Sequence, residues 1–591
     1  MVGEIVKIQR VKIKNYRNLK NIDVELSDVV ALIGENNGGK SNFLKAITLP
    51  FLNTENGYYN KNLSWLDIND EAKNEYYKFL IDYQAEITKG EITFEEFINQ
   101  LPTVVVEVQL KIDEYEEYYV KNLSYSIDNQ ELVYGLRYEY KPYKNRELYD
   151  QVKSILKNEH LNNESIKSTK MNLLPTDFYN YSITVPNKGT ISYDSLQLFK
   201  YTSLEAERDE FSKSKEKLGS KSLVKILQMG LSNEDKLTIE KEYSHFFESL
   251  KSISKMEHIL NWQDESELED AKDFFEHINI LPNMPPMQSL LSSIRLGFLD
   301  KELTSQGLGN RNLILLLVLI NSLIDKDDDT AFNVLTIEEP EAHLCINNIK
   351  LLSSFFKAFT AKYRNVQLFY STHSIEFINK MKLDNVVIIH EGKAFALKSE
   401  LSEDARDYLT RNPNMDIFKL LYSQKCLLFE GVTEEMLIRS YIDSKKELND
   451  IELISFHKGF KDIISIWKKI NIGTSNRLGV LRDYDNQEKA KQEHDNLSDD
   501  KTVCIRTTKE YTLEPEIVKT GNNYEILKET YGEKFGWSEF TEEELQNAWR
   551  NAKALDMLVI CKDIENGELS NLEMPNHVKE VLDFLSRANK G

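Results

Sequence analysis

The chain has 591 residues, which is too long for one hydrophobic core, so two or three domains are expected. Apolar residues make up 41% and aromatic residues 10% of the chain, a composition that excludes global disorder. The formal net charge of −22 excludes a broadly basic nucleic-acid-binding protein, because phosphate contacts require positive charge. Any nucleic-acid contact must therefore come from a local basic patch, bound metal or a partner. We interpret the basic clusters at 7–20 and 213–225 as solvated faces.

Membrane, secretory and disulfide-rich classes are also excluded. The most apolar run, Leu313 to Ile320, is far shorter than the roughly 18 residues that a membrane span needs. The N-terminus lacks the apolar stretch of a signal peptide. The four cysteines are far apart, without the paired spacing of a disulfide framework or a zinc site. We expect a cytoplasmic protein with no membrane partner.

The hydrophobic pattern predicts two α/β regions separated by a polar stretch. The N-terminal region has predicted strands at 5–14, 29–33, 103–112, 131–140 and 181–185. A charged helical pattern from about 203 to 271 is interpreted as an insertion that serves oligomerisation. Strand and helix then alternate from 313 to 389. After a polar boundary at 402–415, which includes Arg-Asn-Pro-Asn at 411–414, further strands are predicted at 425–429 and 478–481.

A phosphate-binding loop is predicted at residues 34–41. They read Gly-Glu-Asn-Asn-Gly-Gly-Lys-Ser and match G-x-x-x-x-G-K-[ST] between a short apolar strand and a helix. In such a loop the backbone N–H groups surround phosphates, the lysine reaches the β- and γ-phosphate oxygens, and the serine ligates magnesium. The alternative is a glycine-rich surface turn that matches by chance. The sequence thus predicts an ATP and magnesium site formed by Gly34, Asn37, Gly39, Lys40, Ser41 and Asn42.

Acidic residues follow a second buried strand. The apolar strand at 333–337 ends in Glu338 and Glu339, which suits one acid that holds magnesium and one that polarises the attacking water. A later strand at 366–370 leads to His373. These motifs resemble the ABC-type ATPases of the RecF/SMC kind, although Glu338 stands where that group usually has aspartate. The resemblance implies that Glu338 is the metal-side acid, Glu339 the catalytic base and His373 the residue that senses the γ-phosphate. Two solvated acids at a strand end and a structural histidine are the alternatives.

A serine-glycine signature is the remaining element of that resemblance. Residues 304–310, Thr-Ser-Gln-Gly-Leu-Gly-Asn, precede a helix predicted to open at Arg311 and place Ser305 at the signature position. The segment departs from the usual Ser-Gly-Gly-Gln, so a plain helix cap remains an alternative. As a signature it implies a homodimer, because in ABC proteins this segment closes the partner's ATP site. Arg17 resembles the early arginine of RecF-like heads.

A second cluster of acids is predicted in the C-terminal region. Glu430 and Gly431 follow the strand at 425–429, and Glu434 lies at the start of the next helix. Asp483 and Asp485 follow the strand at 478–481, and alternate residues of an extended strand share a face. Carboxylates at the carboxyl edge of a parallel sheet, without histidine or cysteine, favour Mg²⁺ or Mn²⁺. Two such ions can support phosphodiester cleavage. This arrangement is similar to the Toprim domain; isolated acids that cap strands are the alternative.

An ABC ATPase followed by Toprim resembles the OLD (overcoming lysogenisation defect) nuclease family, which includes the nuclease subunit of Gabija-type phage defence. The resemblance covers nearly the whole chain. It implies a metal site formed by Glu430, Glu434, Asp483, Asp485 and Glu514. It also implies a late basic catalytic residue, for which Lys553 is the candidate and Lys562 the alternative.

These observations predict an α/β protein with a RecF-like ABC ATPase domain, a helical dimerisation insertion and a C-terminal Toprim domain. The predicted boundaries are 1–200 and 286–400 for the ATPase, 201–285 for the insertion and 420–591 for Toprim. The resemblance implies an ATP-hydrolysing, Mg²⁺- or Mn²⁺-dependent DNA endonuclease or nickase in bacterial anti-phage defence. It would act as a homodimer or higher oligomer through its ATPase domain, alongside a partner such as a helicase or a reverse transcriptase with RNA or DNA. The alternatives are an ATP-switched sensor or clamp with a degenerate Toprim and, more weakly, a RecF-like recombination protein.

Overall fold

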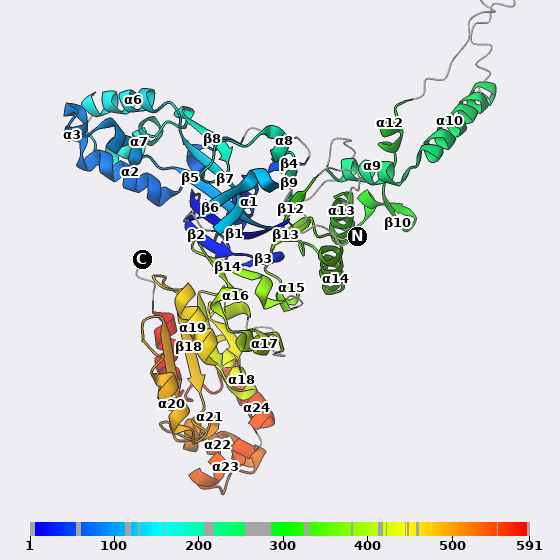
Figure 1. Ribbon diagram of the computed structural model, residues 1–591. Coiled ribbons are helices and arrows are strands. Elements are labelled where there is room, and N and C mark those ends of the chain that lie inside the picture. Colours follow the sequence, from blue (N-terminus) through cyan, green and yellow to red (C-terminus); the bar gives the residue numbers. More distant parts are fainter. Residues whose placement is uncertain are drawn as a thin grey trace, which may run out of the picture. The chain divides into compact units, whose positions relative to one another are not determined.

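The computed structural model (Figure 1) divides into two compact units. One comprises Met1–Leu204, Thr330–Pro340 and Ser353–Gly591, and the other comprises Glu205–Asp329 and Glu341–Leu352. The structure describes residues 6–54, 61–112, 120–127, 131–158, 160–205, 218–253, 285–323, 330–379, 382–411, 418–420, 422–443, 445, 448–456, 460–551 and 553–587.

The first unit begins with an antiparallel sheet in the order β2-β1-β5-β7-β6, with β8 paired to β7. Its strands are β1 (Val6–Tyr16), β2 (Leu19–Glu25), β5 (Val104–Ile112), β6 (Ser124–Ile127), β7 (Glu131–Pro142) and β8 (Tyr179–Thr184). Alternating buried side chains along β5 cover one face of this sheet, as expected for a strand with one face toward a core. Helices α2 (Asp70–Asp82), α3 (Gln84–Lys89), α4 (Phe94–Asn99), α6 (Asn145–Asn158) and α7 (Asn163–Leu173) lie between these strands in the sequence, and α8 (Tyr193–Leu196) follows β8.

A second sheet carries the nucleotide motifs. Its order is β15-β14-β3-β13-β12-β9-β4, parallel except for β15. The strands are β3 (Val29–Ile33), β4 (Leu52–Asn53), β9 (Phe199–Leu204), β12 (Phe332–Glu338), β13 (Val366–Ser371), β14 (Val386–His390) and β15 (Lys393–Ala396). The strands β12, β13 and β14 are buried on both faces. Because β3, β12 and β13 are adjacent and parallel, the motifs that follow them meet at one sheet edge.

A four-stranded parallel sheet, in the order β17-β16-β18-β19, forms the C-terminal part of the first unit. The strands are β16 (Lys425–Phe429), β17 (Glu452–Ser455), β18 (Arg477–Arg482) and β19 (Val503–Thr507). Helices of this part are α18 (Val432–Asp443), α19 (Phe460–Ile470), α20 (Glu488–Asp495), α21 (Leu513–Val518), α22 (Asn523–Phe535), α23 (Glu542–Asn551), α24 (Lys553–Glu565) and α25 (Asn576–Ser586). The remaining helices of the unit are α1 (Lys40–Thr48), α15 (Ile375–Asn379), α16 (Leu397–Glu400) and α17 (Glu403–Arg411).

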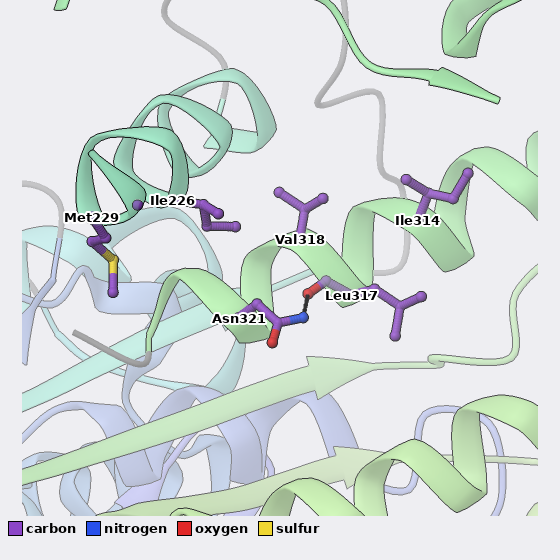
Figure 2. A pocket seen from close by; sticks show the side chains of 7 residues that line it. Ile226, Met229, Ile314, Leu317, Val318 and Asn321 are labelled. Carbon is purple, nitrogen blue, oxygen red and sulfur yellow. Dashed lines mark hydrogen bonds between the residues drawn. The ribbon is translucent and has the colours of Figure 1, made fainter. Parts of the chain in front are cut away.

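The second unit is mainly helical. It contains α9 (Leu218–Gly230), α10 (Asn233–Ile253), α12 (Met287–Leu291), α13 (Leu308–Ser322) and the hairpin of β10 (Gly297–Phe298) and β11 (Lys301–Glu302), and α14 (Ile346–Lys362) begins in it. A groove between α9 and α13 is lined mostly by apolar side chains. Gly230 also lines this groove, and Figure 2 labels the other lining residues: Ile226, Met229, Ile314, Leu317, Val318 and Asn321.

The α/β architecture predicted from the hydrophobic pattern is confirmed, and each predicted strand lies within two residues of an observed one. Other details differ from the prediction. Several strands, β9 among them, were not predicted, the helix expected to open at Arg311 begins at Leu308, and β18 ends at Arg482. Asp485 has a φ of 47°, so Asp483 and Asp485 do not share a face of an extended strand. The Asn-Pro-Asn boundary at 412–414 lies outside the described residues. Among those described, no helix is long and apolar enough to cross a membrane.

Candidate functional site

The phosphate-binding loop connects β3 to α1 and needs its glycines. Gly34 has a φ of 148°, and a Cβ added there would lie 2.0 Å from the carbonyl oxygen of Ile389. Gly39 has a φ of 116° and precedes the first turn of α1. Asn37 also adopts a positive φ, of 61°, a region that asparagine tolerates better than most residues. The local sequence therefore suits a tight loop at a helix N-terminus, which favours phosphate binding.

Lys40 and Ser41 lie where the motif predicts. The Lys40 ammonium is buried and donates to the carbonyl oxygens of Gly34, at 2.9 Å, and Glu35, at 2.8 Å. The Ser41 hydroxyl donates to Glu338 Oε2 at 3.0 Å, across 297 positions of sequence. A hydroxyl and a carboxylate that converge in this way form an all-oxygen donor set, which suits Mg²⁺.

Glu339 and His373 face the same cleft. Glu339 leaves the end of β12 with a φ of 42°, and its amide donates to the Ser371 carbonyl oxygen at 3.1 Å. His373 Nε2 lies 3.9 Å from Glu339 Oε1. Burial lowers the pKa of His373 below its ordinary value, the Lys40 charge acts in the same direction, and Glu339 opposes both. A carboxylate beside a neutral imidazole at the edge of a nucleotide cleft can orient and polarise water.

The predicted residues Asn42 and Arg17 contact each other beside the cleft, and Asn18, which the sequence did not single out as a site residue, joins them. Asn42 donates to Asn18 Oδ1 at 2.9 Å and accepts from Arg17 Nη1 at 3.0 Å. Arg17 also forms an ion pair with Asp67 at 2.8 Å. Through Asn42 it connects the β1–β2 turn to α1. The cleft is lined by Asn18, Asn36, Asn37, Gly39, Lys40, Ser41, Asn42, Glu339, Ser371 and His373. The positive φ at Arg17, of 49°, could not be recognised from its residue type.

The acidic residues of the C-terminal sheet also gather at one edge. Glu430 follows β16, Asp483 follows the adjacent β18, and Glu514 is the second residue of α21. Glu434 is buried in the first turn of α18 and its carboxylate lies over Gly431, where an added Cβ would meet Glu434 Oε2 at 2.1 Å. The absence of a side chain at Gly431 therefore leaves room for this acid.

Repulsion between negative charges raises pKa values within this cluster. Burial, together with the charges of Glu434, Glu514 and Glu430, raises the pKa of Asp483 to about 9. Burial, together with the charges of Asp485 and Glu434, raises the pKa of Glu430 to about 7, although Arg482 opposes this effect. Each of the five predicted acids therefore interacts electrostatically with Asp483 or Glu430. Such crowding favours either bound protons or bound cations.

Two threonines and an arginine organise the acids, and the sequence did not single them out. Thr433 Oγ1 donates to Glu514 Oε1 at 3.2 Å, and Thr512 Oγ1 donates to Glu514 Oε2 at 2.8 Å. The Arg482 guanidinium is buried and lies 3.3 Å from Glu430 Oε1. Only the position of Arg482, directly before Asp483, hinted at this contact.

Comparison with known proteins identifies the first part of the chain. A family model described as an AAA ATPase domain matches residues 7–378, which is more than half of the chain.

The chain belongs to this AAA ATPase domain family.

The matched region contains the phosphate-binding loop, both acids after β12 and His373, so the ATPase assignment and the geometry of the cleft agree. The chain is also similar to Endonuclease GajA of Bacillus cereus (strain HuB5-5), with 21% identity over 498 residues that cover 76% of this chain and 70% of that protein. The predicted resemblance to the OLD-family nucleases is thereby confirmed.

Solved structures give weaker likenesses. An Smc head domain from Pyrococcus furiosus, bound to the C-terminal domain of ScpA, is 12% identical, with a TM-score of 0.30, over 67% of this chain and 98% of that one. The recombination mediator RecF is also 12% identical, with a TM-score of 0.30, over 66% of this chain and 98% of that one. The family match, rather than these likenesses, identifies the ATPase domain.

The fit of a metal differs between the two sites. In the ATPase domain, Ser41 and Glu338 already touch. In the C-terminal sheet, oxygen donors are present, but among the described residues no group of three or more histidine, cysteine, aspartate or glutamate side chains is close enough together to enclose an ion. The donor chemistry of the acids fits Mg²⁺ or Mn²⁺, and their side chains would have to draw together around it.

The roles of two predicted site residues stay predictions. Ser305 lies in the second unit, where its hydroxyl donates to the Glu302 carbonyl oxygen at 2.7 Å. Its role as a signature serine stays a prediction. Lys553 is the first residue of α24, and its side chain lies outside the described part of the chain. The alternative, Lys562, is exposed on the same helix, so the late basic residue also stays a prediction.

Proposed function

We propose that the chain is an ATP-binding and ATP-hydrolysing protein whose C-terminal domain is a divalent-metal-dependent DNA endonuclease. The observation that supports the nuclease half is the gathering of five acids near the carboxyl ends of β16 and β18, where Asp483 and Glu430 are repelled by their acidic neighbours. Similarity to an endonuclease over most of the chain supports the same reaction class.

Glu430, Glu434, Asp483, Asp485 and Glu514 would hold the metal. Bound there, Mg²⁺ or Mn²⁺ would supply an activated water and charge stabilisation for phosphodiester hydrolysis. The chain's own residues would orient the donors. Thr433 and Thr512 fix both oxygens of Glu514, and Arg482 keeps a positive charge beside Glu430.

The test compares cleavage of supercoiled and linear duplex DNA with Mg²⁺ or Mn²⁺, with and without ATP. Wild type is compared with Asp483→Asn, Glu434→Gln and the matched control Glu435→Gln. Glu435 neighbours Glu434 but forms an ion pair with Arg439 at 2.8 Å on the helix surface. We expect the first two variants to lose cleavage and retain ATP hydrolysis, and the control to cleave like wild type. Cleavage by Asp483→Asn at the wild-type rate would contradict the metal-site assignment.

An ATP-switched sensor or clamp is the second candidate. Among the described residues, no three of the acids lie close enough together to hold a metal ion. This spacing favours the sensor or clamp. An ATPase that leaves every duplex uncut with either metal would support this function over the nuclease.

We also propose a homodimer or higher oligomer and a role in antiviral defence, both on the family resemblance. Light scattering with and without ATP tests the first. Phage plating efficiency on cells that express wild type or Asp483→Asn tests the second, and equal plating on both would contradict a defence role for the nuclease.

A further inference from the structure

The phosphate-binding loop has one side chain that points away from the nucleotide cleft. Glu35 is absent from the cleft lining, and its carboxylate is 18% exposed. Its Oε1 accepts from Asn476 Nδ2 at 3.1 Å and lies 3.6 Å from His390 Nδ1. A variable position of the ATP-binding motif is therefore in contact with the C-terminal sheet.

Asn476 is held firmly at the start of that sheet. It is 7% exposed, and its Nδ2 also donates to Asn471 Oδ1 at 2.8 Å. The backbone amide of Asn476 donates to Thr474 Oγ1 at 3.2 Å. The next residue begins β18, and the residue after the last one of β18 is Asp483. The loop 471–476 and the acid cluster are thus opposite ends of one buried strand.

A second connection runs beside the first. The turn between β14 and β15 contacts the phosphate-binding loop, because the Gly392 amide donates to the Gly38 carbonyl oxygen at 3.2 Å. From the same turn, Lys393 Nζ donates to the Ile472 carbonyl oxygen at 3.4 Å. Two separate elements therefore connect the nucleotide loop to residues 471–476.

The hydrogen bonds of Lys40 make this contact sensitive to nucleotide. Its ammonium donates to the carbonyl oxygens of Gly34 and Glu35. When Lys40 donates instead to nucleotide phosphates, these two carbonyl groups lose a charged donor, and the loop around Glu35 must readjust. This readjustment affects Glu35, whose side chain contacts Asn476.

We propose that the Glu35–Asn476 contact couples nucleotide binding in the ATPase domain to the acid cluster at the far end of β18. The part that concerns cleavage rests on the proposed nuclease function, whereas the coupling to β18 itself does not. Asn476 is a positioning residue: it contacts Glu35 of the phosphate-binding loop, but it lines neither the nucleotide cleft nor the acid cluster.

The test uses Asn476→Ala and the matched control Asn522→Ala in the full chain. Asn522 is an exposed asparagine whose side chain does not cap the helix that follows it. Amide hydrogen exchange of peptides spanning 471–482 is measured with and without a non-hydrolysable ATP analogue. We expect the analogue to change exchange in wild type and control, and to leave it unchanged in Asn476→Ala at equal analogue occupancy.

Cleavage provides an independent second measurement. We expect ATP to change the cleavage rate of wild type and control by about fivefold or more. In Asn476→Ala we expect ATP to leave the cleavage rate nearly unchanged. If no protein cleaves, the nuclease proposal fails and hydrogen exchange alone decides the coupling. The proposed coupling would be overturned if the analogue did not change hydrogen exchange in the wild-type peptides, or if it changed exchange in Asn476→Ala as much as in wild type. If Asn476→Ala does not fold, Asn476→Asp, which keeps the side-chain shape but lacks the Nδ2 donor, replaces it.

Discussion

Glu339 has the backbone geometry of a constrained functional residue. A positive φ is uncommon outside glycine and asparagine, and here the Ser371 carbonyl oxygen holds the amide in place. The conformation turns the carboxylate from the end of β12 toward the cleft and His373. The position of this acid therefore depends on the neighbouring strand as well as on its own sequence.

We expect Glu339→Gln to bind ATP and to hydrolyse it about 10²- to 10⁴-fold more slowly, because a general base is lost while the phosphate contacts remain. Lys40→Ala should instead weaken ATP binding about 10- to 100-fold, since it removes a charged donor. Titration with a fluorescent ATP analogue and a phosphate-release assay separate the two effects. Hydrolysis by Glu339→Gln at the wild-type rate would assign the base to another residue.

The acid cluster predicts a pH dependence of stability. The pKa values of Asp483, about 9, and Glu430, about 7, lie above those of exposed carboxyl groups. The folded protein therefore binds more protons than the unfolded chain across neutral pH, and folding stability must fall as pH rises through 7 toward 9.

Without divalent metal, we expect the free energy of unfolding to fall by on the order of 2 kcal/mol between pH 6 and pH 9. Asp483→Asn should lose much of this dependence, because it cannot ionise. Mg²⁺ should restore stability at high pH if the cluster binds it. Denaturant titrations in EDTA and in Mg²⁺ measure both effects, and a wild-type slope in Asp483→Asn would contradict the prediction.

At the scale of elements, the close packing of β18 and α25 positions Asp483. A Cβ added to Gly479 would lie 2.4 Å from Val581 Cγ1 and 3.0 Å from both Leu427 Cδ1 and Leu585 Cδ1. The glycine in the middle of β18 therefore lets α25 lie directly on the strand. A short apolar strand was predictable from its sequence, but this contact depends on a helix about one hundred positions away.

We expect Gly479→Ala to lower the free energy of unfolding by about 1–3 kcal/mol through overpacking. Gly189→Ala is the control, because an added Cβ there meets nothing within 4 Å. Chemical denaturation compares the two variants. Equal stability of both would mean that α25 can move away from β18 at little cost.

At the scale of the whole molecule, the net charge of −22 limits DNA binding. The basic cluster at 7–20 was interpreted as a solvated face, which was wrong for Lys7: it is buried and donates to the Val366 carbonyl oxygen at 2.6 Å. Arg10 pairs with Asp23, and Lys20 pairs with Glu71. Arg10 and Lys20 are therefore neutralised within the protein. Residues 213–217 lie outside the described residues.

A protein that neutralises several phosphates loses about 10³- to 10⁵-fold in affinity between 50 and 200 mM salt. We expect a loss of about tenfold or less here, because the net charge of −22 repels DNA and salt screens that repulsion. Fluorescence anisotropy with labelled duplex and Asp483→Asn in Mg²⁺ measures the slope. A steep loss would mean that a local basic surface of the protein contacts several phosphates.

The sequence by itself determined the phosphate-binding loop and the places along the chain of the strands that carry acids, whereas the preference of those acids for Mg²⁺ or Mn²⁺ stays a prediction. These features are local: backbone N–H groups of one continuous segment surround phosphates, and parallel strands bring their carboxyl ends to one edge. The family match and the similarity to an endonuclease agree with that reasoning.

Only the tertiary structure decided which distant side chains meet. Arg17 bracing Asn42, Thr433 orienting Glu514 and Glu35 contacting Asn476 each join segments that sequence spacing does not relate, the last across 441 positions. Asp485 adopts its turn because β18 ends one residue before Asp483. Such contacts depend on how helices and loops cross the sheet edges, and hydrophobic periodicity specifies which face of an element is buried but not what it meets.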